Sequence, residues 1–220
     1  GDHRDLHRVD RRQRQMCIRD RLLNLTENTQ PVMLAAGFAT YKVLASEVNL
    51  STISIAGHSL GEYTALVASG SLGFFEAVQL VRKRAKLMQA AVPNGSGSMA
   101  AILGLDDVKV IEICSIANRV GVVEAVNFNS PGQVVIAGEI KAVAHACELM
   151  KEAGAKRALV LPVSVPSHCS LMKDAAMDFK HSVDNINFQM GNTKVLHNVD
   201  ADYSSNIEEI KSKLVEQLHK

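Results

Sequence analysis

Hydrophobic and polar positions before residue 92 follow the spacing of helices around one short strand. Apolar residues at helical intervals follow the sequence 29–31, where Pro31 suits an early helical position. The run 52–56 predicts a short buried strand. It leads into the tight turn 57–61, a helix over about 62–69 and a second helix over 74–91. This order is the βα unit of a parallel α/β sheet.

The pattern changes near residue 98 to a compact βαββαβ order, which is ferredoxin-like. The expected strands are 99–103, 120–127, 133–138 and 157–162, and the expected helices are 106–116 and 140–153. Beyond them, 193–199 predicts a further strand of the first sheet, and an amphipathic helix follows with Ile207, Ile210, Leu214 and Leu218 on its apolar face. We therefore expect an α/β fold with a large subdomain (22–97 and 163–220) and an inserted small subdomain (98–162).

Composition indicates a globular protein, because 47% of the 220 residues are hydrophobic, 21% are charged and the net charge is +1. Residues 1–21 hold seven Arg and four Asp, which leaves the remainder slightly acidic. The body of the chain is therefore not expected to bind nucleic acid. The segment 1–21 itself predicts a disordered or foreign tail, with an RNA-binding arm as the weaker alternative.

Membrane and metal roles find no support in the sequence. No apolar run approaches the roughly 18 residues of a membrane span, and the start of the chain lacks the apolar region of a secretory signal. The four cysteines are scattered without a CxxC pair, which argues against a zinc site and a disulfide framework. We expect a cytoplasmic protein without a metal or other cofactor.

Candidate chemistry concentrates at Ser59 in the G-x-S-x-G turn 57–61. A strand before and a helix after this motif present the serine as a nucleophile, and the Leu60 N–H points where an oxyanion develops. A glycine-rich turn with a capping serine is the alternative. Among eight histidines, His168 is the best candidate base, since the others lie near the ends, in regular elements or, like His58, are expected to point away from Ser59. A structural role for His168 in its proline-bounded loop stays open.

Arg84 is the one charge on the apolar stripe of the helix 74–91, where Ala77, Val81 and Met88 also lie. A buried guanidinium requires an anionic partner, and its planar fork suits a carboxylate. That carboxylate belongs either to an internal Asp or Glu or to a substrate.

These residues resemble the malonyl-CoA:acyl carrier protein transacylases of bacterial fatty acid synthesis, from Leu22 to Lys220. The matching motifs are 29–31, 57–63, 81–84, 97–101, 127–133 and 162–168. The resemblance implies a hydrolase-like large subdomain, with Ser59 as nucleophile and His168 as general base of a ping-pong acyl transfer. Malonyl-CoA and holo acyl carrier protein are the implied partners.

The resemblance also assigns binding residues. Arg84 matches the arginine that grips the free malonyl carboxylate, and Gln30 matches a glutamine of the same pocket. Asn127 and Asn129 fall where the family meets the pantetheine arm.

The chain departs from the family at both ends. The family's first strand carries a Gly-Gln-Gly-Ser-Gln loop that residues 1–21 lack, and its sequence beyond residue 218 supplies the acceptor that orients the catalytic histidine. We therefore expect a fragment that is a poor transacylase by itself. Two other functions remain open: a serine esterase of the α/β-hydrolase type, and an inactive fragment that only binds acyl carrier protein or CoA.

Overall fold

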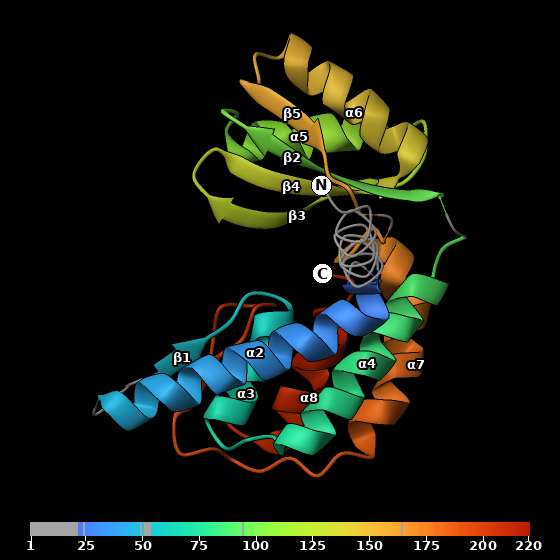
Figure 1. The fold of residues 1–220 in the computed structure, drawn as a ribbon. Coiled ribbons are helices and arrows are strands. Elements are labelled where there is room, and N and C mark those ends of the chain that lie inside the picture. The colour runs from blue at the N-terminus through green and yellow to red at the C-terminus, as the bar shows by residue number, and fades with distance from the viewer. Residues whose placement is uncertain (1–21, 24, 49, 51–53, 94, 164) are drawn as a thin grey trace, which may run out of the picture.

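The computed structural model describes residues 22–23, 25–48, 50, 54–93, 95–163 and 165–220, so the sequence predictions for 1–21 fall outside it. The described chain forms two parts, with a mostly helical part below and a four-stranded sheet with its helices above (Figure 1). This is an α/β fold that contains a parallel and an antiparallel sheet. Among the described helices, none has the length and apolar character needed to cross a bilayer.

The lower part consists of two stretches of chain that flank the upper part in sequence. Its elements are α2 (Thr26–Glu47), β1 (Ser54–Ala56), α3 (Leu60–Ala68), α4 (Phe74–Ala90), the 3-10 turn η1 (Ser170–Met172), α7 (Lys173–Asp184), β6 (Lys194–Leu196) and α8 (Ile207–Glu216). Strands β1 and β6 pair in parallel, with Ile55 opposite Val195, so the strand expected over 193–199 does join the first sheet. The helices enclose one apolar core that includes Tyr63, Leu66 and Phe179.

Two sequence predictions in this part are corrected. Helix α2 begins at Thr26, and Pro31 lies inside it, because the turn before Pro31 is already closed by the Asn28 and Thr29 N–H groups on the Leu25 carbonyl at 2.8 and 2.9 Å. Helix α3 begins at Leu60, two residues earlier than expected. Of the predicted strand 52–56, residues 54–56 form β1 and the other two lie outside the described chain.

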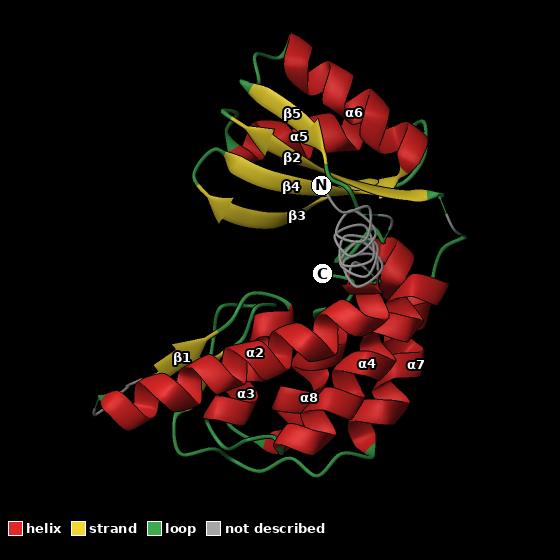
Figure 2. Cartoon of the chain, in the orientation of Figure 1, coloured by secondary structure: helices red, strands yellow, loops and turns green. Residues whose placement is uncertain are grey.

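The upper part follows the predicted βαββαβ order. Its elements are β2 (Gly97–Leu103), α5 (Asp107–Ala117), β3 (Val123–Ser130), β4 (Gln133–Glu139), α6 (Ile140–Glu152) and β5 (Arg157–Val160). The strands lie in the order β3-β4-β2-β5 and all neighbours are antiparallel. Helices α5 and α6 cover one face of this sheet (Figure 2) and enclose a second apolar core with Ile136, Val143 and Met150.

Strand β3 is displaced from the prediction of 120–127. It runs three residues further, so Asn129 and Ser130 belong to the strand and the turn shrinks to Pro131 and Gly132. Gly132 makes this short turn possible with a φ of 73°.

A third apolar cluster connects the two parts. Met99, Val135 and Ala137 of the sheet pack against the fully buried Cys169 of the lower part. The face of the sheet opposite the helices therefore rests on the chain that follows His168.

Candidate active site

Ser59 lies in the turn between β1 and α3 with a φ of 51°, which is unusual for a residue other than glycine. Glycine is required at position 57, because a Cβ there would lie 2.1 Å from the backbone of Gly61. This close approach lets the chain reverse from strand to helix around Ser59. Leu60 is the first residue of α3, so its N–H has no acceptor inside the helix.

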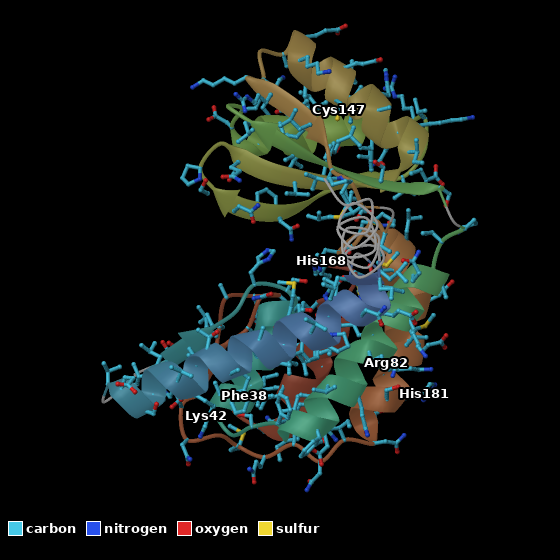
Figure 3. The ribbon with its side chains drawn as sticks, in the orientation of Figure 1. Phe38, Lys42, Arg82, Cys147, His168 and His181 are labelled. Carbon is cyan, nitrogen blue, oxygen red and sulfur yellow. The ribbon has the colours of Figure 1, made fainter. Side chains whose placement is uncertain are left out.

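His168 contacts Ser59 directly, with 2.8 Å between its Nε2 and the Ser59 Oγ. On the other side of the ring, Nδ1 lies 2.6 Å from the backbone oxygen of Gln217. A carbonyl oxygen only accepts, so Nδ1 carries the proton and Nε2 accepts from the Ser59 hydroxyl. Figure 3 shows His168 between the two parts of the molecule.

The Gln217 carbonyl corrects a prediction from the sequence. The acceptor that orients His168 was expected beyond residue 218, yet it lies at the C-terminal end of α8, inside the chain. A backbone carbonyl carries no side-chain signature, which is why the sequence did not reveal it.

Burial lowers the pKa of His168 to about 4, and the positive charge of Arg84 acts in the same direction, while the hydrogen bond to Gln217 opposes both. The imidazole is therefore neutral at physiological pH. It is ready to accept a proton without first losing one.

Arg84 is 2% exposed on α4, on the apolar stripe that the sequence predicted. Its Nη1 donates to Gln30 Oε1 at 2.9 Å, and its Nη2 donates to Ser59 Oγ at 3.2 Å and to Gln217 Oε1 at 3.0 Å. Within the described part of the chain, its buried Nε has no hydrogen-bond partner, and none of the ion pairs includes Arg84.

The hydrogen-bond partners of Arg84 are thus neutral groups, one of them the Ser59 hydroxyl. Burial lowers its pKa, with Tyr63 and Glu62 acting in the opposite sense, but a guanidinium keeps its proton in a folded protein. Of the two partners considered from the sequence, an internal carboxylate does not contact it.

The buried residues Glu62 and His197 form a network with the more exposed Asn198 that the sequence reasoning missed. The Glu62 carboxylate contacts His197 Nδ1 at 2.7 Å and accepts from the Asn198 N–H at 3.2 Å and from Gln217 Nε2 at 2.6 Å. Glu62 is fully buried and is the one charged residue in α3. That isolated charge in an apolar helix was the available signal.

The Asn198 side chain holds the turn that carries Ser59. Its Nδ2 donates to the Gly57 carbonyl at 2.7 Å, and its Oδ1 accepts from the Ser59 N–H. Glu62 therefore links α3, the residues after β6 and the residue after α8 at one point.

A cavity of about 220 Å³ opens onto Ser59 and His168. Strand β3 supplies one wall through Val126, Asn127 and Phe128. Asn129, the other asparagine assigned from the sequence, is exposed and does not line this cavity.

Comparison with known proteins gives the family. The sequence profile of the acyl transferase domain matches residues 11–211. This chain belongs to the acyl transferase domain family. The malonyl CoA-acyl carrier protein transacylase of Haemophilus influenzae is 52% identical over 198 residues, which are 90% of this chain and 64% of that protein. This chain therefore spans just under two thirds of the length of that relative.

Solved structures of similar proteins share the fold. The crystal structure of FabD from Acinetobacter baumannii is 48% identical with a TM-score of 0.87, over 90% of this chain and 63% of that one. A malonyl-transacylase in complex with a type II polyketide acyl-carrier protein is 47% identical with a TM-score of 0.88, over 90% of this chain and 64% of that one. This chain is therefore similar in both sequence and structure to proteins named as malonyl transacylases.

Proposed function

We propose that this acyl transferase domain moves a malonyl group from CoA to the phosphopantetheine thiol of acyl carrier protein, a step of fatty acid biosynthesis, through malonyl-Ser59. The name of the Haemophilus influenzae relative supports both the acyl group and the acceptor. The complex of one relative with an acyl-carrier protein supports the partner.

The observation that carries the proposal is Arg84. Its Nη2 lies 3.2 Å from the Ser59 Oγ, and no carboxylate of the described chain makes an ion pair with it. An acyl group on Ser59 that ends in a free carboxylate would supply the missing anion in a two-pronged contact. Gln30 would hold the guanidinium in place through its 2.9 Å bond to Nη1.

The proton moves opposite to the acyl group in both halves of the reaction. His168 Nε2 takes the Ser59 proton as Oγ attacks the thioester, and the Leu60 N–H stabilises the oxyanion. The CoA sulfur leaves with that proton. In the second half, the phosphopantetheine thiol gives its proton to His168 and attacks malonyl-Ser59, and the proton returns to Ser59. The Gln217 carbonyl stabilises His168 while its ring is charged.

The fold supports the same proposal in finer detail. The strand order β3-β4-β2-β5 fits an inserted ferredoxin-like subdomain, and the nucleophile turn fits a hydrolase-like large subdomain. Asn127 in the cavity wall would meet the pantetheine arm, and we retain Asn129 as a contact further out. We also propose a cytoplasmic location, in line with the free, buried thiols of Cys114, Cys147 and Cys169.

A serine esterase of the α/β-hydrolase type is less well supported. Such an enzyme orients its histidine with an acidic side chain, whereas the His168 Nδ1 contacts the backbone carbonyl of Gln217. The uncharged acyl groups of ordinary esters would also leave Arg84 without an anion.

Mass spectrometry tests the proposal. After incubation with malonyl-CoA, the peptide with Ser59 is expected to gain a malonyl group, and holo acyl carrier protein is expected to remove it. The Ser59→Ala variant is the control. Labelling that persists in this variant contradicts the role of Ser59. An acyl-Ser59 that passes to water but not to a pantetheine thiol favours the esterase, and a chain that binds CoA without labelling favours the binding fragment.

A further inference from the structure

Glu124 connects the upper part of the molecule to the segment that carries His168. Its Oε2 accepts from the Ser170 N–H at 3.0 Å, and its Oε1 accepts from the Ser170 hydroxyl. One carboxylate thus accepts hydrogen bonds from both donors of Ser170, the residue that lies two positions after His168. Hydrogen bonds to a charged acceptor are about twice as strong as those between neutral groups.

The segment at His168 needs such support because its backbone is strained. His168 has a φ of 66°, a left-handed conformation that costs a residue other than glycine about 1–3 kcal/mol and persists only when neighbouring groups hold it. From the lower part, the Leu218 carbonyl accepts from the His168 N–H at 3.1 Å. From the upper part, Met99, Val135 and Ala137 enclose the side chain of Cys169.

The same strand that carries Glu124 also forms the wall of the active-site cavity. Val126, Asn127 and Phe128 follow Glu124 along β3 and line the cavity with Ser59 and His168. In Figure 1, β3 is the strand of the upper sheet nearest to the lower part. The carboxylate therefore links the strand of the cavity wall to the segment that carries His168.

We propose that Glu124 is a positioning residue for the general base, which it holds against Ser59 through Ser170. This inference rests on the proposed acyl transfer. The placement of the small subdomain then determines how His168 is held against Ser59.

Single-turnover acylation of Ser59 by malonyl-CoA tests this role in the full chain. Glu124→Ala is expected to slow acylation by about 10- to 100-fold, because a displacement on the order of 1 Å at a reacting group costs up to about 100-fold. Glu124→Gln is expected to lie between this variant and the wild type, since an amide keeps one acceptor but opposes the second donor. Glu152→Ala is the matched control, because it removes an exposed carboxylate from the same subdomain.

Two further measurements separate positioning from folding. The double variant Glu124→Ala/Ser170→Ala is expected to be no slower than Glu124→Ala alone, since both changes remove the same contact. The dissociation constant of malonyl-CoA, measured on a Ser59→Ala background, is expected to stay within about twofold when Glu124 is also replaced, and hydrogen exchange at the Ser170 amide is expected to accelerate.

An acylation rate of Glu124→Ala within twofold of the wild-type rate would overturn the inference. A slower rate would also overturn it if the variant has lost malonyl-CoA binding or its folding transition, and that loss accounts for the slower rate. A wild-type chain that takes no malonyl group contradicts the proposed function instead. In that case, the rate at which a fluorophosphonate labels Ser59 is compared between the wild type and Glu124→Ala. This comparison tests the role of Glu124, because the labelling reaction also depends on the base. An unchanged rate, or no labelling of the wild-type chain, would count against Glu124.

Discussion

Ser59 and His168 face each other from two strained backbone positions, with φ values of 51° and 66°. Strain of this kind concentrates at active sites, because the surrounding contacts hold a geometry that the residue alone would leave. Asn198 holds the turn at the first of these positions. At the second, the Leu218 carbonyl accepts from the His168 N–H, and Ser170, two residues further along the chain, is bound by Glu124. The 2.8 Å contact between the two side chains is thus maintained by residues that have no part in the proposed acyl transfer.

Arg84 is expected to select acyl groups that carry a free carboxylate. Removal of one partner from a desolvated charge pair costs about 2–5 kcal/mol. Arg84→Ala should therefore reduce kcat/KM for malonyl-CoA by the factor that corresponds to this free energy, and reduce kcat/KM for acetyl-CoA far less. Arg84→Lys should restore little activity, because an ammonium lacks the planar fork. The measurement is parallel kinetics with both thioesters. Equal losses for the two would mean that Arg84 only supports the structure around Gln30 and Gln217.

His168 is expected to make folding stability depend on pH. Its pKa falls from an ordinary value of 6.5 to about 4 in the folded chain, chiefly through burial. Between these values the unfolded chain binds the proton and the folded chain does not, so stability is full above pH 6.5 and falls as the pH drops towards 4. The loss amounts to about 3 kcal/mol, since each pKa unit is worth about 1.4 kcal/mol.

Urea unfolding of the wild type and of His168→Gln at several pH values measures this effect. The difference in unfolding free energy between the two proteins should change by about 3 kcal/mol from pH 7 to pH 4, while the remaining histidines contribute equally to both. A difference that does not vary with pH would show that the folded imidazole has its ordinary pKa.

The connection between β1 and α3 distinguishes the two glycines of the G-x-S-x-G motif. A Cβ at Gly57 would lie 2.1 Å from the backbone of Gly61, whereas a Cβ at Gly61 meets no atom within 4 Å. Gly57→Ala should therefore destabilise the fold by about 3 kcal/mol, the upper end of ordinary overpacking, and abolish acylation of Ser59. Gly61→Ala should stay within about 1 kcal/mol, because alanine favours the helix. Thermal unfolding of the matched pair checks this, and a tolerated alanine at 57 would contradict the close approach.

The elements show which features of the site the sequence could predict. Periodicity placed Arg84 on the buried face of α4, and the strand–turn–helix order located Ser59, because both are local signals. The Gln217 carbonyl and the Glu62 network were missed, since Glu62 meets His197 across 135 positions and His168 meets Gln217 across 49. Contacts at that separation depend on how α3, β6 and α8 pack, which no single-sequence pattern records. The start of α2 was missed for the opposite reason, because the local signal of Pro31 was weaker than the turn closed by Leu25.

Across the molecule, the described strands of the two sheets differ in the number of paired positions and in how deeply their residues are buried. In the upper sheet, β2 and β4 pair over seven positions, from Gly97 opposite Glu139 to Leu103 opposite Gln133, and residues along both strands are buried against the core of α5 and α6. Within the described residues of the lower sheet, β1 pairs with β6 over three positions, and Ser54 and Ala56 are exposed. Local opening requires less free energy where fewer buried contacts and hydrogen bonds must break.

Hydrogen exchange is therefore expected to divide the molecule. Amides of 99–103 and 133–138 should exchange slowly, near the rate set by global unfolding, and those of 54–56 should exchange faster by a factor of at least about 10, which corresponds to a difference of roughly 1.4 kcal/mol in opening free energy. Because β1 leads directly to Ser59, faster exchange there would place the proposed nucleophile at the less stable edge of the fold, while the strand that carries Glu124 belongs to the more stable sheet. Mass spectrometry of peptides from both sheets measures the contrast. Uniform protection across them would show that the two parts open together as one cooperative unit.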